Sequence, residues 1–133
     1  WSDGYENVAV GCTVENQDRD DHRLPIFLSI PIRHRLVVAA PLLERLDLEP
    51  YLDPEKIEEV SVGGESGRYA RALDFDWVLG LSRQCLDASI PFCFHQTGSH
   101  LLKDGRLYQI PRSLQHSQAR RAGLDTATHN PIK

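Results

Sequence analysis

The chain has 133 residues, with 41% hydrophobic side chains, 26% charged side chains and a formal charge of -4. This length fits one ordinary domain with a hydrophobic core, and the mildly acidic charge gives no support to nucleic-acid binding. No apolar run approaches the ~20 residues of a membrane-spanning helix, and the polar N-terminus does not resemble a signal peptide.

Methionine is absent, even at position 1, which leads us to expect a fragment or excised domain rather than a whole gene product. The three cysteines, Cys12, Cys85 and Cys93, have no Cys-x-x-Cys spacing. Their odd number and wide separation indicate reduced, buried thiols, and therefore predict a cytoplasmic protein.

The first third of the chain alternates between strand and helix patterns. Residues 8–14 and 36–40 are nearly continuous apolar runs, too short for helices, which is typical of parallel strands covered on both faces. A short helix is predicted over residues 23–30, because Pro25 stands near its start, where proline is tolerated, and Pro31 follows its end.

The same alternation continues through the middle of the chain. A short leucine-rich helix is predicted over residues 42–48, and a third strand over residues 60–62. The clearest helix is predicted over residues 74–89, where apolar side chains recur on one face. Asp74 or Asp76 can cap its N-terminus.

The pattern changes after the fourth predicted strand, residues 90–94. An Asp-Gly pair at the centre of residues 101–110 is a strong β-hairpin signal. A short basic helix is predicted over residues 113–122, stopped by the glycine that follows it, and residues 125–133 are predicted to form a flexible tail.

These elements together predict an α/β fold. Strands that alternate with helices form parallel sheets with right-handed crossovers, so we expect a parallel sheet of about four βα units. A C-terminal β-hairpin and a short helix complete a single domain over residues 1–124.

The third predicted strand ends in Gly-Gly-Glu-Ser-Gly at residues 63–67. So many glycines in five positions indicate a tight turn, a positive φ or the close approach of a ligand. Functional groups collect at the carboxyl ends of parallel strands. We therefore predict a ligand-binding loop formed by Gly63, Gly64, Glu65 and Ser66.

Polar residues also follow two other predicted strands. Glu15 and Asn16 follow the first strand, either as ligand-binding residues or as caps of the next segment. His95 and Gln96 follow the fourth strand, where a lone histidine is either functional or a satisfied core residue. Because parallel strands end at the same edge, these four residues are further candidates for ligand binding.

Two arginines, Arg68 and Arg71, follow the glycine loop and suggest a weak anion site, with solvated arginines as the alternative. The histidines lack metal-ligand spacing, so no metal site is predicted. The loop is not a P-loop, because no Lys-Ser/Thr pair follows it, and it is one residue short of a nucleophile elbow.

Several short sequence blocks, spread over most of the chain, match the pattern of a known protein family. They are residues 7–17, 41–43, 62–67, 76–78, 84–85, 90–92, 103–106 and 117–123. In order and number they resemble an uncharacterised phage- and bacterium-associated protein family related to the radical-SAM enzymes. The resemblance implies a radical-SAM-like (β/α) barrel, of which this chain is the C-terminal half. It also implies that an iron–sulfur cluster and S-adenosylmethionine bind only with the missing N-terminal half, so this chain alone holds no cofactor.

Two positions depart from the pattern of that family. Ala40 stands where the family has an acidic residue before Pro-Leu-Leu, and His95 stands where it has a lysine in Phe-Lys-Gln. Both lie at the predicted functional edge, and both lack the charged group. These departures favour a degenerate or repurposed copy.

Three functions therefore follow from the sequence. In the first, Glu15, Asn16, Glu65, Ser66 and Gln96 help a phage-associated, radical-SAM-like barrel to bind S-adenosylmethionine or a substrate. In the second, the chain is a non-catalytic ligand- or nucleotide-binding module. In the third, it is a structural or assembly fragment, whose unpaired sheet edges self-associate, meet a partner chain or are covered by its own tail.

Overall fold

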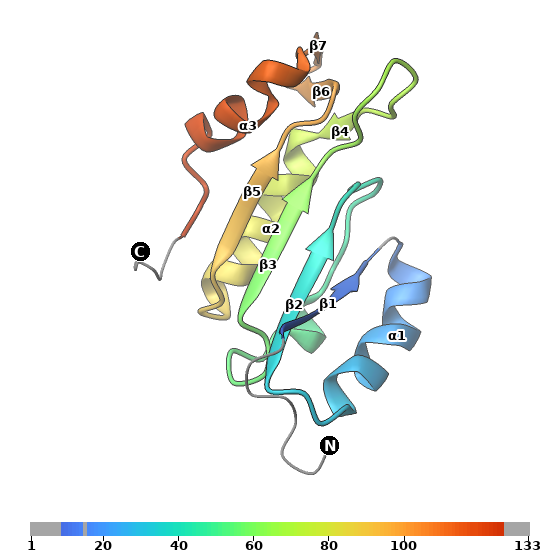
Figure 1. The fold of residues 1–133 in the computed structure, drawn as a ribbon, viewed down its shortest axis with the longest axis vertical. Helices are drawn as coiled ribbons and strands as arrows, with labels where there is room; N and C mark the ends of the chain where they lie inside the picture. Colours follow the sequence, from blue (N-terminus) through green and yellow to red (C-terminus); the bar gives the residue numbers. More distant parts are fainter. Residues whose placement is uncertain (1–8, 15, 127–133) are drawn as a thin grey trace.

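The computed structural model describes residues 9–14 and 16–126. Its main sheet has four parallel strands in the order β1-β2-β3-β5, which run from Ala9–Thr13, His34–Ala39, Glu59–Gly63 and Phe92–Gln96. Each strand lies beside the one that precedes it in this sheet, so the order never reverses (Figure 1). The predicted α/β fold with a four-stranded parallel sheet is confirmed.

In the described part of the chain, three α-helices and one short 3-10 helix connect or flank the strands: α1 (Gln17–Ser29), η1 (Glu49–Tyr51), α2 (Phe75–Asp87) and α3 (Arg112–Arg121). A second, small sheet has the order β4-β6-β7, with strands Leu73–Asp74, His100–Lys103 and Arg106–Gln109. The predicted C-terminal hairpin and short helix are confirmed. Within the described residues, no helix is both long and apolar enough to cross a lipid bilayer.

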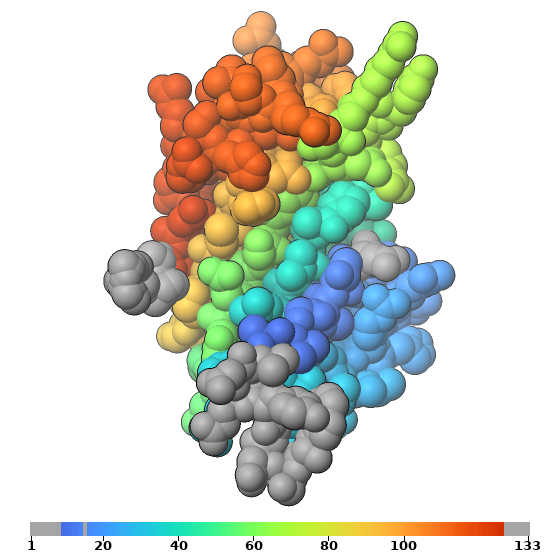
Figure 2. Space-filling view, viewed as in Figure 1, coloured from blue at the N-terminus to red at the C-terminus, as the bar shows by residue number. Residues whose placement is uncertain are grey.

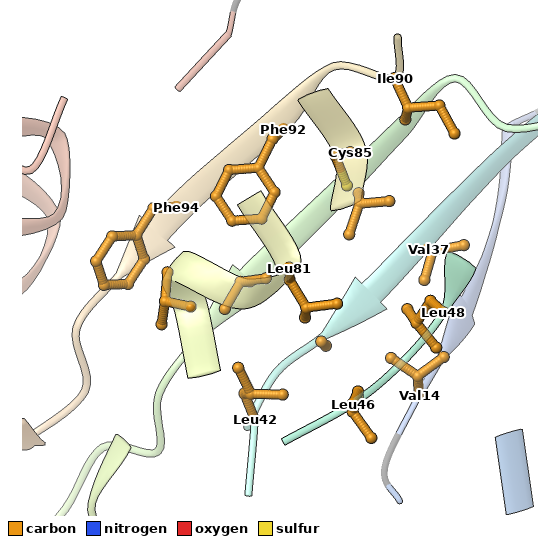
Figure 3. Close-up of a cluster of buried hydrophobic side chains, with 14 of the residues drawn as sticks. Val14, Val37, Leu42, Leu46, Leu48, Leu81, Cys85, Ile90, Phe92 and Phe94 are labelled. Carbon is orange, nitrogen blue, oxygen red and sulfur yellow. The ribbon is translucent and has the colours of Figure 1, made fainter. Parts of the chain in front are cut away.

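The hydrophobic core lies between the sheet and its helices. Cys12, Val37, Val60 and Phe92 are partners in adjacent strands, and each is at most 8% exposed. The side chains of Val37 and Phe92 lie on the side of the sheet that α2 covers, where Leu81 of α2 is fully buried (Figure 3). Each fully buried large apolar side chain contributes about 1.5–3 kcal/mol, so this layer is the main source of stability.

The opposite face of the main sheet differs from the prediction that its strands are covered on both sides. Thr13, Val38, Ser61 and Cys93 form one row across the four strands, and all are partly or fully exposed. No described helix lies over β2 and β3 on this side, where the strands reach the surface as adjacent bands (Figure 2). We call this row, together with His95, the open face.

Helix α1 begins at Gln17 and not at residue 23 as predicted. The side chain of Asn16 accepts a hydrogen bond from the N–H of Arg19 at 2.9 Å, which caps the helix at this earlier point. Pro25 therefore lies inside α1 rather than near its start. The sequence prediction failed because polar residues fill the first turns of the helix.

The helix predicted over residues 42–48 is wrong, because the segment is irregular until η1 begins. The side chain of Gln84, on α2, accepts a hydrogen bond from the N–H of Leu48 at 2.8 Å and donates one to the carbonyl of Leu46 at 2.9 Å. These bonds satisfy the backbone from outside, so the leucines are buried without forming a helix.

The outer edge of β5 is covered by the chain itself. The N–H of Thr126 donates to the carbonyl of Phe92 at 3.0 Å, and its hydroxyl accepts the N–H of Phe92 at 2.8 Å. Asp125 accepts the N–H of Phe94 at 2.7 Å. The first two residues of the predicted tail are thus bonded to the sheet, whereas residues 127–133 lie outside the described residues.

The other edge of the sheet is β1. The N–H of Val14 donates to the carbonyl of Val38 at 2.9 Å, and the alternation of a parallel strand therefore turns the N–H groups of Gly11 and Thr13 away from β2. A hollow of about 420 Å³ lies beside this edge and is partly lined by Ile26 of α1, which is 64% exposed. No other described strand pairs with this side of β1.

Candidate functional site

The glycine loop after β3 touches the chain that follows β5. A Cβ atom on Gly64 would lie 2.4 Å from the carbonyl oxygen of Thr97. A Cβ atom on Gly98, which has a φ of +75°, would lie 2.8 Å from the backbone nitrogen of Glu65. The close approach for which the sequence suggested a ligand is therefore made by the protein's own backbone.

Gln96 joins the same two segments through its side-chain amide. Its Nε2 donates to the carbonyl of Gly64 at 2.6 Å, and its Oε1 accepts the N–H of Gly98 at 2.5 Å. A Cβ atom on Gly63 would lie 3.1 Å from this Nε2. The structure thus brings Gly63, Gly64 and Gln96 together at the carboxyl ends of β3 and β5.

Glu65 is paired with Arg71 inside the loop. The Oε1 atom of Glu65 accepts hydrogen bonds from the backbone N–H of Arg71 at 2.9 Å and from the Nε of Arg71 at 3.0 Å. The Oε2 atom of Glu65 accepts one from the Nη2 of Arg71 at 3.0 Å. The side-chain and backbone hydrogen bonds from Arg71 lower the pKa of Glu65 from its usual value of 4.5 to about 2.

The two arginines of the predicted anion site have different neighbours in the structure. Arg71 is committed to Glu65, and Arg68 lies over the ring of Tyr69, with its guanidinium carbon 5.5 Å from the ring centroid. Tyr69 is 87% exposed, and the segment that connects β3 to β4 projects from the molecule at the upper right of Figure 2. The two guanidinium groups therefore have separate partners.

The Glu65–Arg71 pair predicts a pH dependence of stability. The folded pKa of Glu65 lies below its unfolded value, so the stabilisation is complete above about pH 5 and decreases as the pH falls towards 2. We expect Glu65→Gln to be less stable than the wild type at neutral pH and to approach it at low pH. Urea unfolding of both proteins between about pH 7 and pH 3 measures this difference, and a gap that stays constant with pH would contradict the assignment.

Ser66 connects the loop to α3. Its hydroxyl donates to Oε1 of Gln115 at 2.7 Å, and the Nε2 of Gln115 donates to the carbonyl of Ile110 at 3.0 Å. Gln115 is only 4% exposed. Sequence reasoning missed Gln115, because a glutamine in a polar helix gives no local signal that its side chain is buried.

The remaining predicted residues have different surroundings. Asn16 caps α1, which is one of the two roles that the sequence left open, and Glu15 lies outside the described residues. His95 is exposed on the open face, with its ring in edge-to-face contact with that of His116 at 4.8 Å. The structure therefore joins the ends of β3 and β5 but records no contact between Asn16 and that group.

Two titratable side chains on the main sheet were not predicted as site residues. Burial raises the pKa of Glu59, and the nearby carboxylates of Asp125 and Glu58 raise it further. Burial also raises the pKa of Cys93 to about 11, again with help from Asp125 and Glu59. The alternation of β3 places Glu59 on the same side as Ser61, and this periodicity was the available signal.

The cysteines do not form a metal-binding group. All three are free thiols: Cys12 and Cys85 are buried, and burial raises the pKa of Cys85 to about 12. Among residues 9–14 and 16–126, no three or more histidine, cysteine, aspartate or glutamate side chains are placed to hold a metal ion.

Comparison with known families identifies the domain. A family model described as a protein of unknown function (DUF5131) matches residues 1–132. The chain belongs to the DUF5131 family. No curated protein and no solved structure matches it. The DUF5131 match spans both sheets and all of the helices, but it names no ligand and no reaction.

Proposed function

We propose that this chain supplies part of a (β/α) barrel of the radical-SAM kind, whose interior is the open face. The observation that carries the proposal is a strand order that never reverses, with α1 and α2 contributing to one core on one side. Doubly wound sheets reverse their order and carry helices on both faces. Consecutive parallel strands with right-handed crossovers keep their helices outside, as barrels do.

The edge formed by β1 supports the addition of further strands. The N–H groups of Gly11 and Thr13 point away from β2, and the hollow beside them is lined by apolar side chains such as Ile26 and Phe27. We propose that an N-terminal half of the barrel, or a partner chain that replaces it, pairs here. Self-association through the same edge is the competing outcome.

Ligand binding would fall to the carboxyl ends of the strands, beside the open face. His95 is exposed there, and Gly63 and Gln96 form the adjoining rim. Glu65 and Ser66 already have partners in the chain, but carboxylate and hydroxyl oxygens can accept more than one hydrogen bond. S-adenosylmethionine or a substrate is the proposed ligand. An iron–sulfur cluster would be held outside this chain and would supply the electron chemistry.

The test uses the natural full-length protein under anaerobic conditions, after reconstitution with iron and sulfide. The proposal predicts bound iron and reductive cleavage of S-adenosylmethionine. A protein that is folded but binds no iron and cleaves no S-adenosylmethionine would exclude this enzyme function.

A variant of the open face tests where the ligand binds. We expect His95→Ala to weaken S-adenosylmethionine binding about fivefold, because it removes an exposed polar group at the rim without disturbing the core. His22→Ala on the exposed side of α1 is the matched control and is expected to leave the affinity unchanged. Isothermal titration of the full-length protein measures the affinity of both variants for S-adenosylmethionine. If the His95→Ala and His22→Ala variants bind it equally well, the ligand does not bind at the open face.

A second candidate is a ligand-binding module without turnover. The observation that favours it is the position of Ala40, whose Cβ would lie 3.5 Å from a Cβ atom on Gly63, where an acidic side chain would reach the rim. This candidate predicts that S-adenosylmethionine or a nucleotide raises the melting temperature while no ligand is consumed. If Ala40→Asp confers cleavage on such a protein, the missing carboxylate explains the lost activity.

A further inference from the structure

A hollow of about 400 Å³ lies where α2, the β6–β7 hairpin and α3 meet. Its floor is formed by Phe94, Thr97 and Leu101, which are 1%, 1% and 8% exposed. Phe94 belongs to the helix-covered side of β5, so the hollow is separate from the open face (Figure 3). We call it the aromatic pocket.

Three aromatic side chains, Phe75, Phe94 and Tyr108, contribute to the walls of the aromatic pocket. The rings of Phe75 and Phe94 lie 6.2 Å apart at an interplanar angle of 43°, and Tyr108, on the hairpin, is 42% exposed. Leu101 and Ile110 add aliphatic surface. These aromatic side chains favour a ligand with a planar aromatic ring, because aromatic rings pack well against one another in stacked or edge-to-face contacts.

The rim of the aromatic pocket carries more positive than negative charge. Lys103 and Arg121 lie there, opposed by the single carboxylate of Asp104. The ammonium of Lys103 lies 4.9 Å from the centroid of Phe75, and neither cation forms an ion pair with a described residue. Two cations beside aromatic rings favour a ligand with an anionic group.

We propose that the aromatic pocket binds a small planar aromatic anion. The ring would pack against Phe75 and Tyr108, and its phosphate or carboxylate would meet Lys103 and Arg121. The volume falls within the range of about 300–1,000 Å³ that is usual for small-molecule sites. This site is independent of the proposed function, because it lies on the other side of the main sheet.

The experiment is an isothermal titration of the intact protein with four probes: adenosine monophosphate, adenosine, 4-hydroxyphenylacetate and inorganic phosphate. We expect a ring and an anion to be needed together, so that the monophosphate binds at least about tenfold more tightly than adenosine or inorganic phosphate. Binding of 4-hydroxyphenylacetate in place of the monophosphate would assign the site to aromatic carboxylates.

Neighbouring arginines of α3 provide a matched pair of variants. Arg121 lines the aromatic pocket and Arg120 does not, although both are exposed and both belong to the last turn. We expect Arg121→Gln and Lys103→Gln each to weaken the bound probe about five- to tenfold, and Arg120→Gln to have no effect. Because these side chains are exposed, the variants should keep the wild-type melting temperature.

Three results would overturn the proposal. The first is that no probe saturates at about 1 mM, and the second is that inorganic phosphate binds as tightly as the aromatic anions. The third is that the arginine variants weaken binding equally, since a diffuse positive surface would then explain it. The outcome of this titration does not depend on whether the protein cleaves S-adenosylmethionine, so the two proposals can be refuted independently.

Discussion

Gly64→Ala is expected to destabilise the fold by about 3 kcal/mol or more. The added Cβ would lie 2.4 Å from the carbonyl oxygen and 2.8 Å from the carbonyl carbon of Thr97. Both are backbone atoms, so no side-chain rotation relieves the clash. The ends of β3 and β5 would have to separate, and the hydrogen bonds of Gln96 that join them would be lost. Urea unfolding, followed by circular dichroism, measures the effect.

The control for this variant is Gly80→Ala in α2. Its Cβ would meet only the guanidinium of Arg45 at 3.6 Å, which is an ordinary contact. Because alanine favours helix more than glycine does, we expect this variant to be more stable by about 0.5 kcal/mol. If Gly64→Ala unfolds at the same urea concentration as the wild type, the two chain segments are not in contact.

Gln115→Leu is expected to cost about 2–3 kcal/mol. The side chain of Gln115 is buried and connects α3 to Ser66 and to the carbonyl of Ile110. Leucine has a similar volume but no hydrogen-bonding group, so the bonds to the exposed hydroxyl of Ser66 and to the half-buried carbonyl of Ile110 are both lost. The N–H of Gly67 donates to the hydroxyl of Ser99 at 2.8 Å, and the Nε2 of Gln115 donates to the same hydroxyl at 3.4 Å. The glycine loop should therefore loosen in the variant, which faster hydrogen exchange at Gly67 would report.

Gln118→Leu is the matched control for Gln115→Leu. Gln118 lies in the same helix, is partly exposed and makes no side-chain hydrogen bond with a described residue. We therefore expect the stability of Gln118→Leu to stay within about 0.5 kcal/mol of the wild type. Equal effects of the two variants would mean that leucine destabilises α3 itself, and that the contact with Ser66 contributes little.

The fold was predictable where its signals are local. The apolar face of α2, the Asp-Gly hairpin and the glycine that ends α3 each lie within a few residues of the element that they define. The helix predicted over residues 42–48 failed because Gln84, far along the chain, satisfies the backbone there. Strand β4 was missed because it has only two residues.

The meeting of the ends of β3 and β5 was predictable from the sequence, but the contacts made there were not. Parallel strands end together, so the sequence correctly placed Gly64 near Gln96. The reason for the glycines lies in Thr97 and Gly98, which approach only after the chain has folded. The pairing of Glu65 likewise depends on a turn that the sequence does not specify.

The open face could not be predicted from the apolar runs alone. Val37 and Val38 are neighbours of similar chemistry, yet Val37 is 1% exposed against the helices and Val38 lies on the open face. A continuous apolar strand looks the same whether both faces are covered by this chain or one is covered by something else. The partial exposure of the open face is the observation that leads to the barrel proposal.

Hydrogen exchange at β1 in the natural full-length protein tests the barrel proposal most directly. The N–H of Val14 is bonded to β2 and serves as an internal reference, whereas those of Gly11 and Thr13 point away from β2. If further strands close a barrel here, all three amides should exchange slowly and to a similar degree. Fast exchange at Gly11 and Thr13 beside a protected Val14 would show a free edge, and would contradict the barrel.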